Sequence, residues 1–209
     1  MKEDKMKKID TMSPRKLRSL QTREKLLQAG RDIFSEYGFH KATISQIIKK
    51  ANTGYGTAYV HFKGKDDLLI QLMEEVMNHF YEIAELSFEP KTKQEAYEMI
   101  EKQTHAFLKM ANEERAMMQA IEEAIRMSDE VRMKWEEIRE RFIQRIAQDI
   151  AYSQQNRLAR TDLNNQFIAR GWFFTNEMYL WEIVRNGRDV PVKEIAHNLT
   201  AMYTGGLYQ

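Results

Sequence analysis

Hydrogen-bonding side chains are concentrated between residues 43 and 67, in the run TISQIIKKANTGYGTAYVHFKGKDD. Thr43 stands where a helix begins, and its hydroxyl can cap the backbone, contact a phosphate, or do both, because helix N-termini attract anions. Tyr55, Gly56 and Thr57 open a second short helix, where side chains first meet base edges and Gly56 permits close approach of the backbone. The chemistry that this stretch offers is hydrogen bonding to a nucleic acid.

Residues that usually carry catalysis or bind metals are scattered. The five histidines include no pair at the i, i+3 or i, i+4 spacing of helical metal ligands, and no serine lies in a nucleophile elbow. The glycines form neither a P-loop nor a dinucleotide fingerprint, and cysteine is absent. We therefore expect no catalytic residue, no metal site and no cofactor, so the chain is not expected to be an enzyme.

The hydrogen-bonding groups are positioned by two short helices and the turn between them. Thr43 and Gln46 have the spacing of a capping box, which predicts a helix from Ile44 to about residue 51. Asn52 tolerates the left-handed conformation and Gly54 is sterically unrestricted, so a sharp turn follows. Two short helices cannot bury much alone, so a third must pack behind them. This pattern is typical of a helix-turn-helix, whose second helix enters the major groove.

The same stretch resembles the DNA-binding domain of the TetR/AcrR family of repressors. The resemblance rests on the run from Phe39 to Thr43 and on GTAY, FKGK and DLL further along, and it covers about residues 21–72 closely. Asn52 and Gly54 depart from the residues that the family has more often, but both suit a turn. The resemblance implies a dimer that binds duplex DNA and a second region that binds a small effector.

The resemblance also assigns roles to single residues. It implies that the Tyr59 hydroxyl and Lys65 contact phosphates and that Ser45 reaches a base or a phosphate, while a core tyrosine remains the alternative for Tyr59. His61 stays ambiguous. The candidate DNA-binding residues are Thr43, Ser45, Tyr55, Gly56, Thr57, Tyr59, His61 and Lys65.

Charge is divided unevenly along the chain of 209 residues, although the net charge is only +1. Residues 1–65 carry 15 Lys and Arg against 6 Asp and Glu, whereas residues 66–209 carry 17 against 25. A basic region suits phosphate binding, and DNA would repel the acidic one. No apolar run approaches the ~20 residues of a membrane span, so we expect a cytoplasmic protein that makes no membrane contact.

The hydrophobic spacing predicts an all-α chain of about nine helices in three parts. Residues 1–20 form a basic disordered arm, either a solvated tail or a segment that follows phosphates or the minor groove. Residues 21–65 form the helix-turn-helix domain, and residues 66–209 form a helical region for effector binding and dimerisation. The expected helices span about 22–37, 44–51, 55–62, 66–86, 92–111, 114–127, 129–156, 161–185 and 192–203.

The second region has two expected tasks. The stretch from Gly171 to Trp181 is apolar nearly all round, so it needs two packing partners, and with the last helix it predicts half of a four-helix dimer seam. The candidate dimer residues are Trp172, Tyr179, Ile195, Leu199 and Met202. A monomer with ordinary core helices is the alternative.

Thirteen methionines and many aromatic residues suit either an adaptable ligand cavity or an ordinary core. The family resemblance favours a cavity among the expected helices 66–86, 92–111, 129–156 and 161–185. The candidate ligand residues are Met73, Met77, His105, Phe107, Met110, Trp135, Phe142, Phe173 and Glu177. The function predicted is a repressor that binds a palindromic operator as a homodimer and is released by an unknown apolar or amphipathic effector. The alternative is a DNA-binding protein that is constitutive or controlled by a protein partner, with no cavity.

Overall fold

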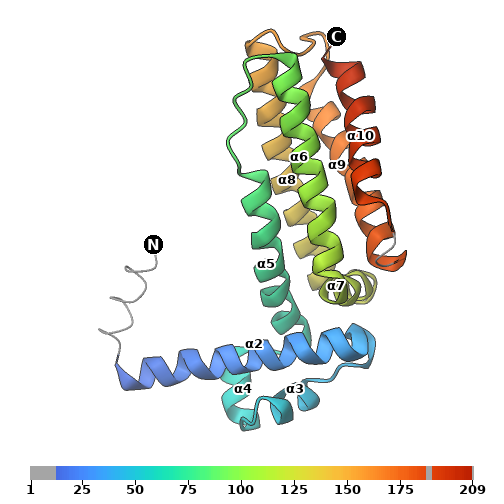
Figure 1. Ribbon diagram of the computed structural model, residues 1–209. Coiled ribbons are helices and arrows are strands. Elements are labelled where there is room, and N and C mark those ends of the chain that lie inside the picture. The colour runs from blue at the N-terminus through green and yellow to red at the C-terminus, as the bar shows by residue number, and fades with distance from the viewer. Residues whose placement is uncertain (1–12, 187–189, 209) are drawn as a thin grey trace.

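The computed structural model describes residues 13–186 and 190–208 and shows a small head joined to a long helical bundle (Figure 1). In these described residues the chain forms nine helices and no strand, which confirms the expected all-α fold. The helices are α2 (Pro14–Lys41), α3 (Ile44–Lys50), α4 (Tyr55–His61), α5 (Lys65–Ala84), α6 (Lys93–Glu113), α7 (Arg115–Met127), α8 (Asp129–Gln155), α9 (Asn165–Asn186) and α10 (Val192–Leu207). The first three form the head.

The first described helix begins earlier than predicted. Ser13 caps α2 by accepting a hydrogen bond from the Lys16 amide, and Pro14 occupies the first turn, where a missing N–H costs nothing. The end of the expected disordered arm, residues 14–20, is therefore helical, and residues 1–12 of that arm lie outside the described residues. Regular geometry ends at Gly38, whose φ of 72° turns the chain back so that Phe39 is buried.

The turn between α3 and α4 follows the sequence prediction. The Thr43 hydroxyl accepts from the Gln46 amide at 3.2 Å, and the Gln46 side chain accepts from the Thr43 amide at 2.8 Å, so the capping box is confirmed. Asn52 adopts a positive φ of 52°, as the left-handed turn requires. Local interactions thus fix the angle at which α4 leaves α3.

Two elements join the head to the bundle. Helix α5 buries a broad apolar stripe that runs from Leu68 to Phe80 and serves both regions, as expected. Helix α7 lies against α2 at the end of the bundle (Figure 1), a second connection that the sequence did not predict. Polar contacts reinforce it, because Arg31 donates to Glu114 at 3.3 Å and the His40 amide donates to Glu123 at 3.1 Å.

Close packing of α2 on α5 gives a test of the head's rigidity. A Cβ added at Gly30 would lie 2.3 Å from Leu68 Cδ2, and Leu68 is fully buried. We expect Gly30→Ala to lower the free energy of unfolding, because overpacking costs about 1–3 kcal/mol and helix propensity returns at most about 1 kcal/mol. Urea unfolding measures the difference. Gly56→Ala is the control, because no described atom lies within 4 Å of its added Cβ and it should be neutral or stabilising. Equal effects of the two substitutions would contradict the prediction.

Candidate functional site

Helix α4 presents almost all of its residues to solvent. Ala58 is its only buried residue, and the Tyr59 ring is 51% exposed, which excludes the core alternative for this tyrosine. Tyr55, Gly56 and Thr57 are exposed on the same short helix. A helix with so little buried surface contributes little to the fold, and its polar groups are free to contact a partner.

The neighbouring helix α3 adds two of the predicted residues. Thr43 and Ser45 are both exposed. Ser45 lines a shallow groove between α3 and α4 together with Lys49, Thr53 and Tyr55. His61 is half-buried at the end of α4. The structure therefore places seven of the eight predicted DNA-binding residues on α3, on its N-cap and on α4.

Lys65, the eighth, has a different place. Its ammonium donates to the carbonyl oxygens of Phe39 at 2.9 Å and Ala42 at 3.1 Å, and it lies 4.2 Å from the centre of the Phe39 ring. These contacts hold two of the three ammonium protons, so the phosphate contact predicted for Lys65 stays a prediction, with one proton left for it. Lys65 fixes the chain between α2 and α3 to the start of α5.

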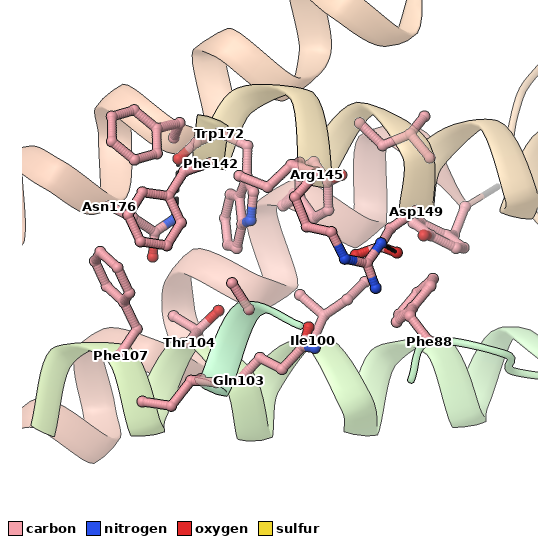
Figure 2. Close-up of a pocket in the computed structure, with 17 residues that line it drawn as sticks. Phe88, Ile100, Gln103, Thr104, Phe107, Phe142, Arg145, Asp149, Trp172 and Asn176 are labelled. Carbon is pink, nitrogen blue, oxygen red and sulfur yellow. Dashed lines mark hydrogen bonds and ion pairs between the residues drawn. The ribbon is translucent and has the colours of Figure 1, made fainter. Parts of the chain in front are cut away.

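A cavity of about 90 Å³ lies inside the bundle, among α5, α6, α8, α9 and α10 (Figure 2). Four of these helices are the ones in which a cavity was predicted, and α10 is an addition. The wall is mainly aromatic and aliphatic. Its lining residues are Ile83, Ala84, Phe88, Ile100, Gln103, Thr104, Phe107, Phe142, Arg145, Ile146, Asp149, Ile150, Trp172, Phe173, Asn176, Tyr203 and Tyr208.

One end of the cavity combines aromatic rings with polar groups. Phe107 and Phe173 both contact the ring of Phe142, with centroids 5.9 Å away in each case. Asn176 lies near Phe107 and Phe142 in Figure 2, and its Oδ1 is buried with no hydrogen-bond partner among the described residues. Thr104 is also buried there. This end can bind a planar ring that carries a polar group.

The other end of the cavity holds an ion pair between Arg145 and Asp149. Burial raises the pKa of Asp149 to about 6, and the Arg145 charge offsets only part of that rise. Burial also raises the pKa of Tyr203 and of Tyr208, so both phenols are neutral. The cavity therefore has little net charge at neutral pH.

The structure brings together three of the nine predicted ligand residues, Phe107, Phe142 and Phe173. Met73 and Met77 are fully buried in the core outside the cavity, because their side of α5 faces other helices. His105 lines a shallow surface groove between α6 and α10, and Met110 is half-buried elsewhere. These four predictions are corrected.

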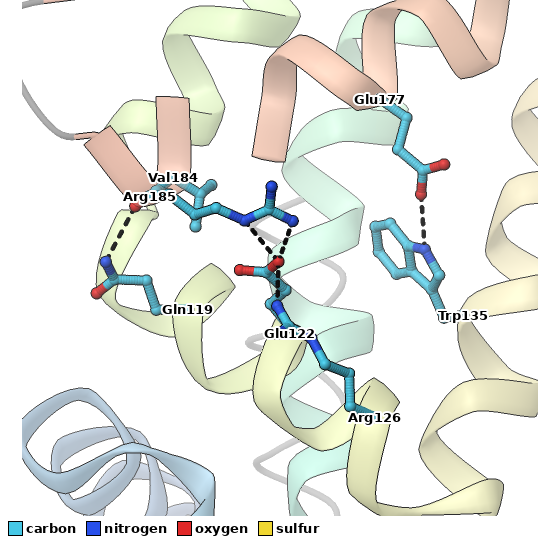
Figure 3. Close-up of polar contacts among 7 residues, drawn as sticks. All are labelled: Gln119, Glu122, Arg126, Trp135, Glu177, Val184 and Arg185. Carbon is cyan, nitrogen blue, oxygen red and sulfur yellow. Dashed lines mark hydrogen bonds and ion pairs between the residues drawn. The ribbon is translucent and has the colours of Figure 1, made fainter. Parts of the chain in front are cut away.

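Trp135 and Glu177 also lie outside the cavity, because they bind each other. The Trp135 indole donates to Glu177 Oε1 at 2.8 Å (Figure 3), and Arg139 donates to the same oxygen at 2.8 Å. Glu177 is thus a buried carboxylate with its charge compensated inside the chain, which is the structural alternative to a ligand contact.

The predicted dimer residues are divided between surface and interior. Met202 is 74% exposed and is available to a partner. Leu199 is only 4% exposed, because its side of α10 faces the chain's own helices, so it is corrected to a core residue. Trp172 lines the cavity and stacks on Tyr203 at 4.2 Å, while Tyr179 and Ile195 are half-buried against the core.

The most informative cavity residues were not predicted. Asn176 and Asp149 are polar residues within apolar helical stretches, a signal that the sequence contained. Tyr208 was missed because α10 continues through two glycines to Leu207, beyond its expected end at Tyr203. Its hydroxyl lies 3.0 Å from the Ser153 hydroxyl and holds the end of the chain against α8.

Residues 26–72 match the family model described as "Bacterial regulatory proteins, tetR family". A relative from Bacillus subtilis, named as the uncharacterized HTH-type transcriptional regulator YvdT, is 45% identical over 56 residues. The matched part covers 27% of this chain and only 29% of that relative. The residues that match the family model belong to the head and to the first part of α5.

Two solved structures share the fold over most of the chain. FadR from Bacillus subtilis, in complex with stearoyl-CoA, superposes with a TM-score of 0.70 at 20% identity, over 88% of this chain and 98% of that one. SmeT, in complex with triclosan, superposes with a TM-score of 0.71 at 16% identity, over 90% and 92%. At these identities the likeness shows that the bundle shares their fold.

The buried carboxyl of Asp149 predicts a pH dependence of stability. Its pKa is about 6 in the folded chain against its usual value of 3.8, so the native state binds the extra proton between these pH values. The stability that it contributes is present below about pH 4 and is lost as the pH rises through about 6. We expect the unfolding free energy of Asp149→Asn, minus that of the wild type, to rise by about 1–3 kcal/mol between pH 4 and 7.

Denaturant unfolding at several pH values measures this difference. Asp162→Asn is the control, since this exposed carboxyl has a lowered pKa through its hydrogen bond with Arg160. The control should show no such rise. A flat difference for Asp149→Asn would refute the assignment of a raised pKa to this group.

Proposed function

We propose, from the premise that this chain is a TetR-family transcriptional regulator, that it represses by binding a near-palindromic DNA operator as a homodimer. A small apolar or amphipathic effector bound in the cavity then releases it. Relatives with the same head are named as transcriptional regulators, which agrees with a non-catalytic role.

The main observation that supports the proposal is the exposure of α4. Six of its seven residues, from Tyr55 to His61, are left unburied by the fold, and a capped turn fixes their orientation. Base edges are contacted by side chains on such a helix, whereas phosphates are contacted by hydroxyls and helix termini around it. Thr57 is suited to the first role, and Thr43 and Tyr59 to the second.

We infer dimerisation from the small number of base pairs that one such helix can contact. A single short recognition helix contacts too few base pairs to select one genomic site, and two copies bound to consecutive major grooves solve this. Apolar side chains are exposed along one stripe of α9, at Phe167, Phe174 and Met178, and at Met202 on α10. A second copy that packed on these helices would bury them.

Contacts that connect the cavity to the head support effector release. Helix α9 lines the cavity, and its end binds α7, because Gln119 donates to the Val184 carbonyl at 3.0 Å and Arg185 donates to Glu122 (Figure 3). Helix α7 in turn packs on α2 in the head. A ligand that shifts α9 or α5 would change the separation of the two reading heads, which must stay roughly 34–36 Å apart for consecutive grooves.

The alternative is a regulator that no small molecule controls. The cavity of about 90 Å³ favours an effector, but it is smaller than the several hundred Å³ expected of a large-ligand site. The effector must therefore be small or must widen the cavity as it enters. A constitutive regulator would bind DNA equally with and without any compound that enters the cavity.

DNA selected from a random pool tests the function. We expect Tyr59→Phe to weaken binding about equally on the selected sequence and on unrelated DNA, because a phosphate contact carries no sequence information. Thr57→Ala should instead change the preferred base at one position per half-site. If the pool yields no enriched sequence, the proposed function fails. If Tyr59→Phe changes base preference more than Thr57→Ala does, the division of roles on α4 is wrong.

A charge at the exposed end of α10 tests the dimer. We expect wild-type protein to sediment as a dimer at micromolar concentration and Met202→Glu to sediment as a 24.8 kDa monomer. The variant should also lose at least about tenfold in operator affinity, because one head then binds alone. Met127→Glu places the same charge on an exposed methionine of α7 and should leave both properties unchanged. A monomeric wild type would contradict the prediction.

A further inference from the structure

The geometry points to a specific chemical class of effector: a small, neutral, single-ring phenol. Its hydroxyl donates to Asn176 Oδ1 and accepts from the Thr104 hydroxyl, while its ring packs against the phenylalanines of the cavity. This inference deepens the proposed function, on which it rests, by naming the ligand of the same site.

Asn176 supplies the strongest observation. Its side chain is 6% exposed, and its amide nitrogen donates to the Trp172 carbonyl at 2.9 Å. That carbonyl can only accept, so the nitrogen must face it and Oδ1 must face away. Oδ1 is buried and has no partner among the described residues, and Asn176 is one of the residues that line the cavity. A buried acceptor of this kind costs stability until a ligand donates to it.

Thr104 supplies the complementary group. It is buried on α6 and borders the same cavity, and its hydroxyl makes no hydrogen bond with any side chain in the described part of the protein. A threonine hydroxyl can both donate and accept. A phenolic O–H also does both, so one ligand oxygen can satisfy Asn176 and Thr104 together. An ether oxygen can only accept and leaves Asn176 unpaired.

The rings around these groups favour an aromatic ligand. Phe142 and Phe173 are nearly parallel, at 18°, whereas Phe107 meets Phe142 edge-on, at 81°. A flat ring can extend either arrangement by stacking or by edge contact. The volume of about 90 Å³ is below the ~150 Å³ of an engineered cavity that holds benzene. Even one ring must therefore displace part of the wall, and larger ligands are disfavoured.

Charge favours a neutral ligand over an anion. The only cationic side chain that lines the cavity in the described residues is Arg145, and Asp149 already pairs with it. Arg145 also donates to the Leu86 carbonyl. A carboxylate or phosphate would enter an apolar space with no free cation, so no interaction there would compensate for the loss of its hydration.

Titration calorimetry of the full chain without DNA tests the class. The probes are 4-methylphenol, 4-methylanisole, which replaces the donor by a methyl ether, and benzoate, which is anionic. We expect the phenol to bind at least about tenfold more tightly than the ether, the ratio expected for one hydrogen bond to an otherwise unpaired buried group. Benzoate should not bind measurably at the same concentrations.

Variants of the two polar residues localise the effect. Asn176→Leu should reduce the preference for phenol over ether to within about threefold. It should lower the melting temperature little, because the lost hydrogen bond to the Trp172 carbonyl is offset by removal of a buried acceptor that has no partner among the described residues. Thr104→Val should reduce the preference as well, whereas Thr104→Ser should restore it. Thr200→Val is the matched control, because Thr200 has a buried hydroxyl that also lacks a partner among the described residues but lies outside the cavity.

Two results would overturn the inference: equal affinity for the phenol and the ether, or a preference that survives Asn176→Leu and Thr104→Val. Each leaves the proposed function standing if the chain still selects a DNA sequence. Conversely, a phenol that binds as expected but leaves operator affinity unchanged supports the ligand class and overturns effector release. Coupling must be reciprocal, so phenol affinity measured with and without saturating operator separates these cases.

Discussion

The structure depends on the elements that keep helix α4 in position, because α4 buries too little of its own surface to do so. Helix α4 buries only Ala58, so its own packing contributes little to its position. The capping box at Thr43 and the left-handed Asn52 set its direction, and Lys65 joins the end of α2 to the start of α5 through two carbonyl oxygens. The surface of α4 can stay exposed only because neighbouring elements supply the stability that its own packing does not.

Those neighbouring elements belong as much to the bundle as to the head. The apolar stripe of α5 is buried on both sides of the junction, and α7 packs on α2 while binding the end of α9. The head therefore cannot change its orientation without disturbing elements next to the cavity. A mechanism that passes through α5 alone leaves out a second connection. Helix α7 contacts both α9, which lines the cavity, and α2 in the head.

Local signals predicted the head well. The capping box, the turn at Asn52 and the exposure of α4 all follow from residues close together in the chain. The cavity was predicted less well, because whether a helical stripe faces the core or a void depends on how distant helices cross. Met73 lies on a correctly predicted helix but on a fully packed side. Lys65 shows the same limit, since the family pattern could not reveal the Phe39 and Ala42 carbonyls that surround its ammonium.

The unpaired oxygen of Asn176 is best understood against its neighbour Glu177. Glu177 is also buried on α9, yet both Trp135 and Arg139 donate to it, so the fold compensates for its burial. For Asn176 Oδ1 the fold supplies no donor among the described residues, although an apolar side chain of similar size would avoid the penalty. The chain thus supplies hydrogen-bond donors to Glu177 but, among the described residues, none to the Oδ1 of Asn176 at the edge of the cavity. That contrast, within one turn of one helix, is the reason for placing the recognition of a ligand at Asn176.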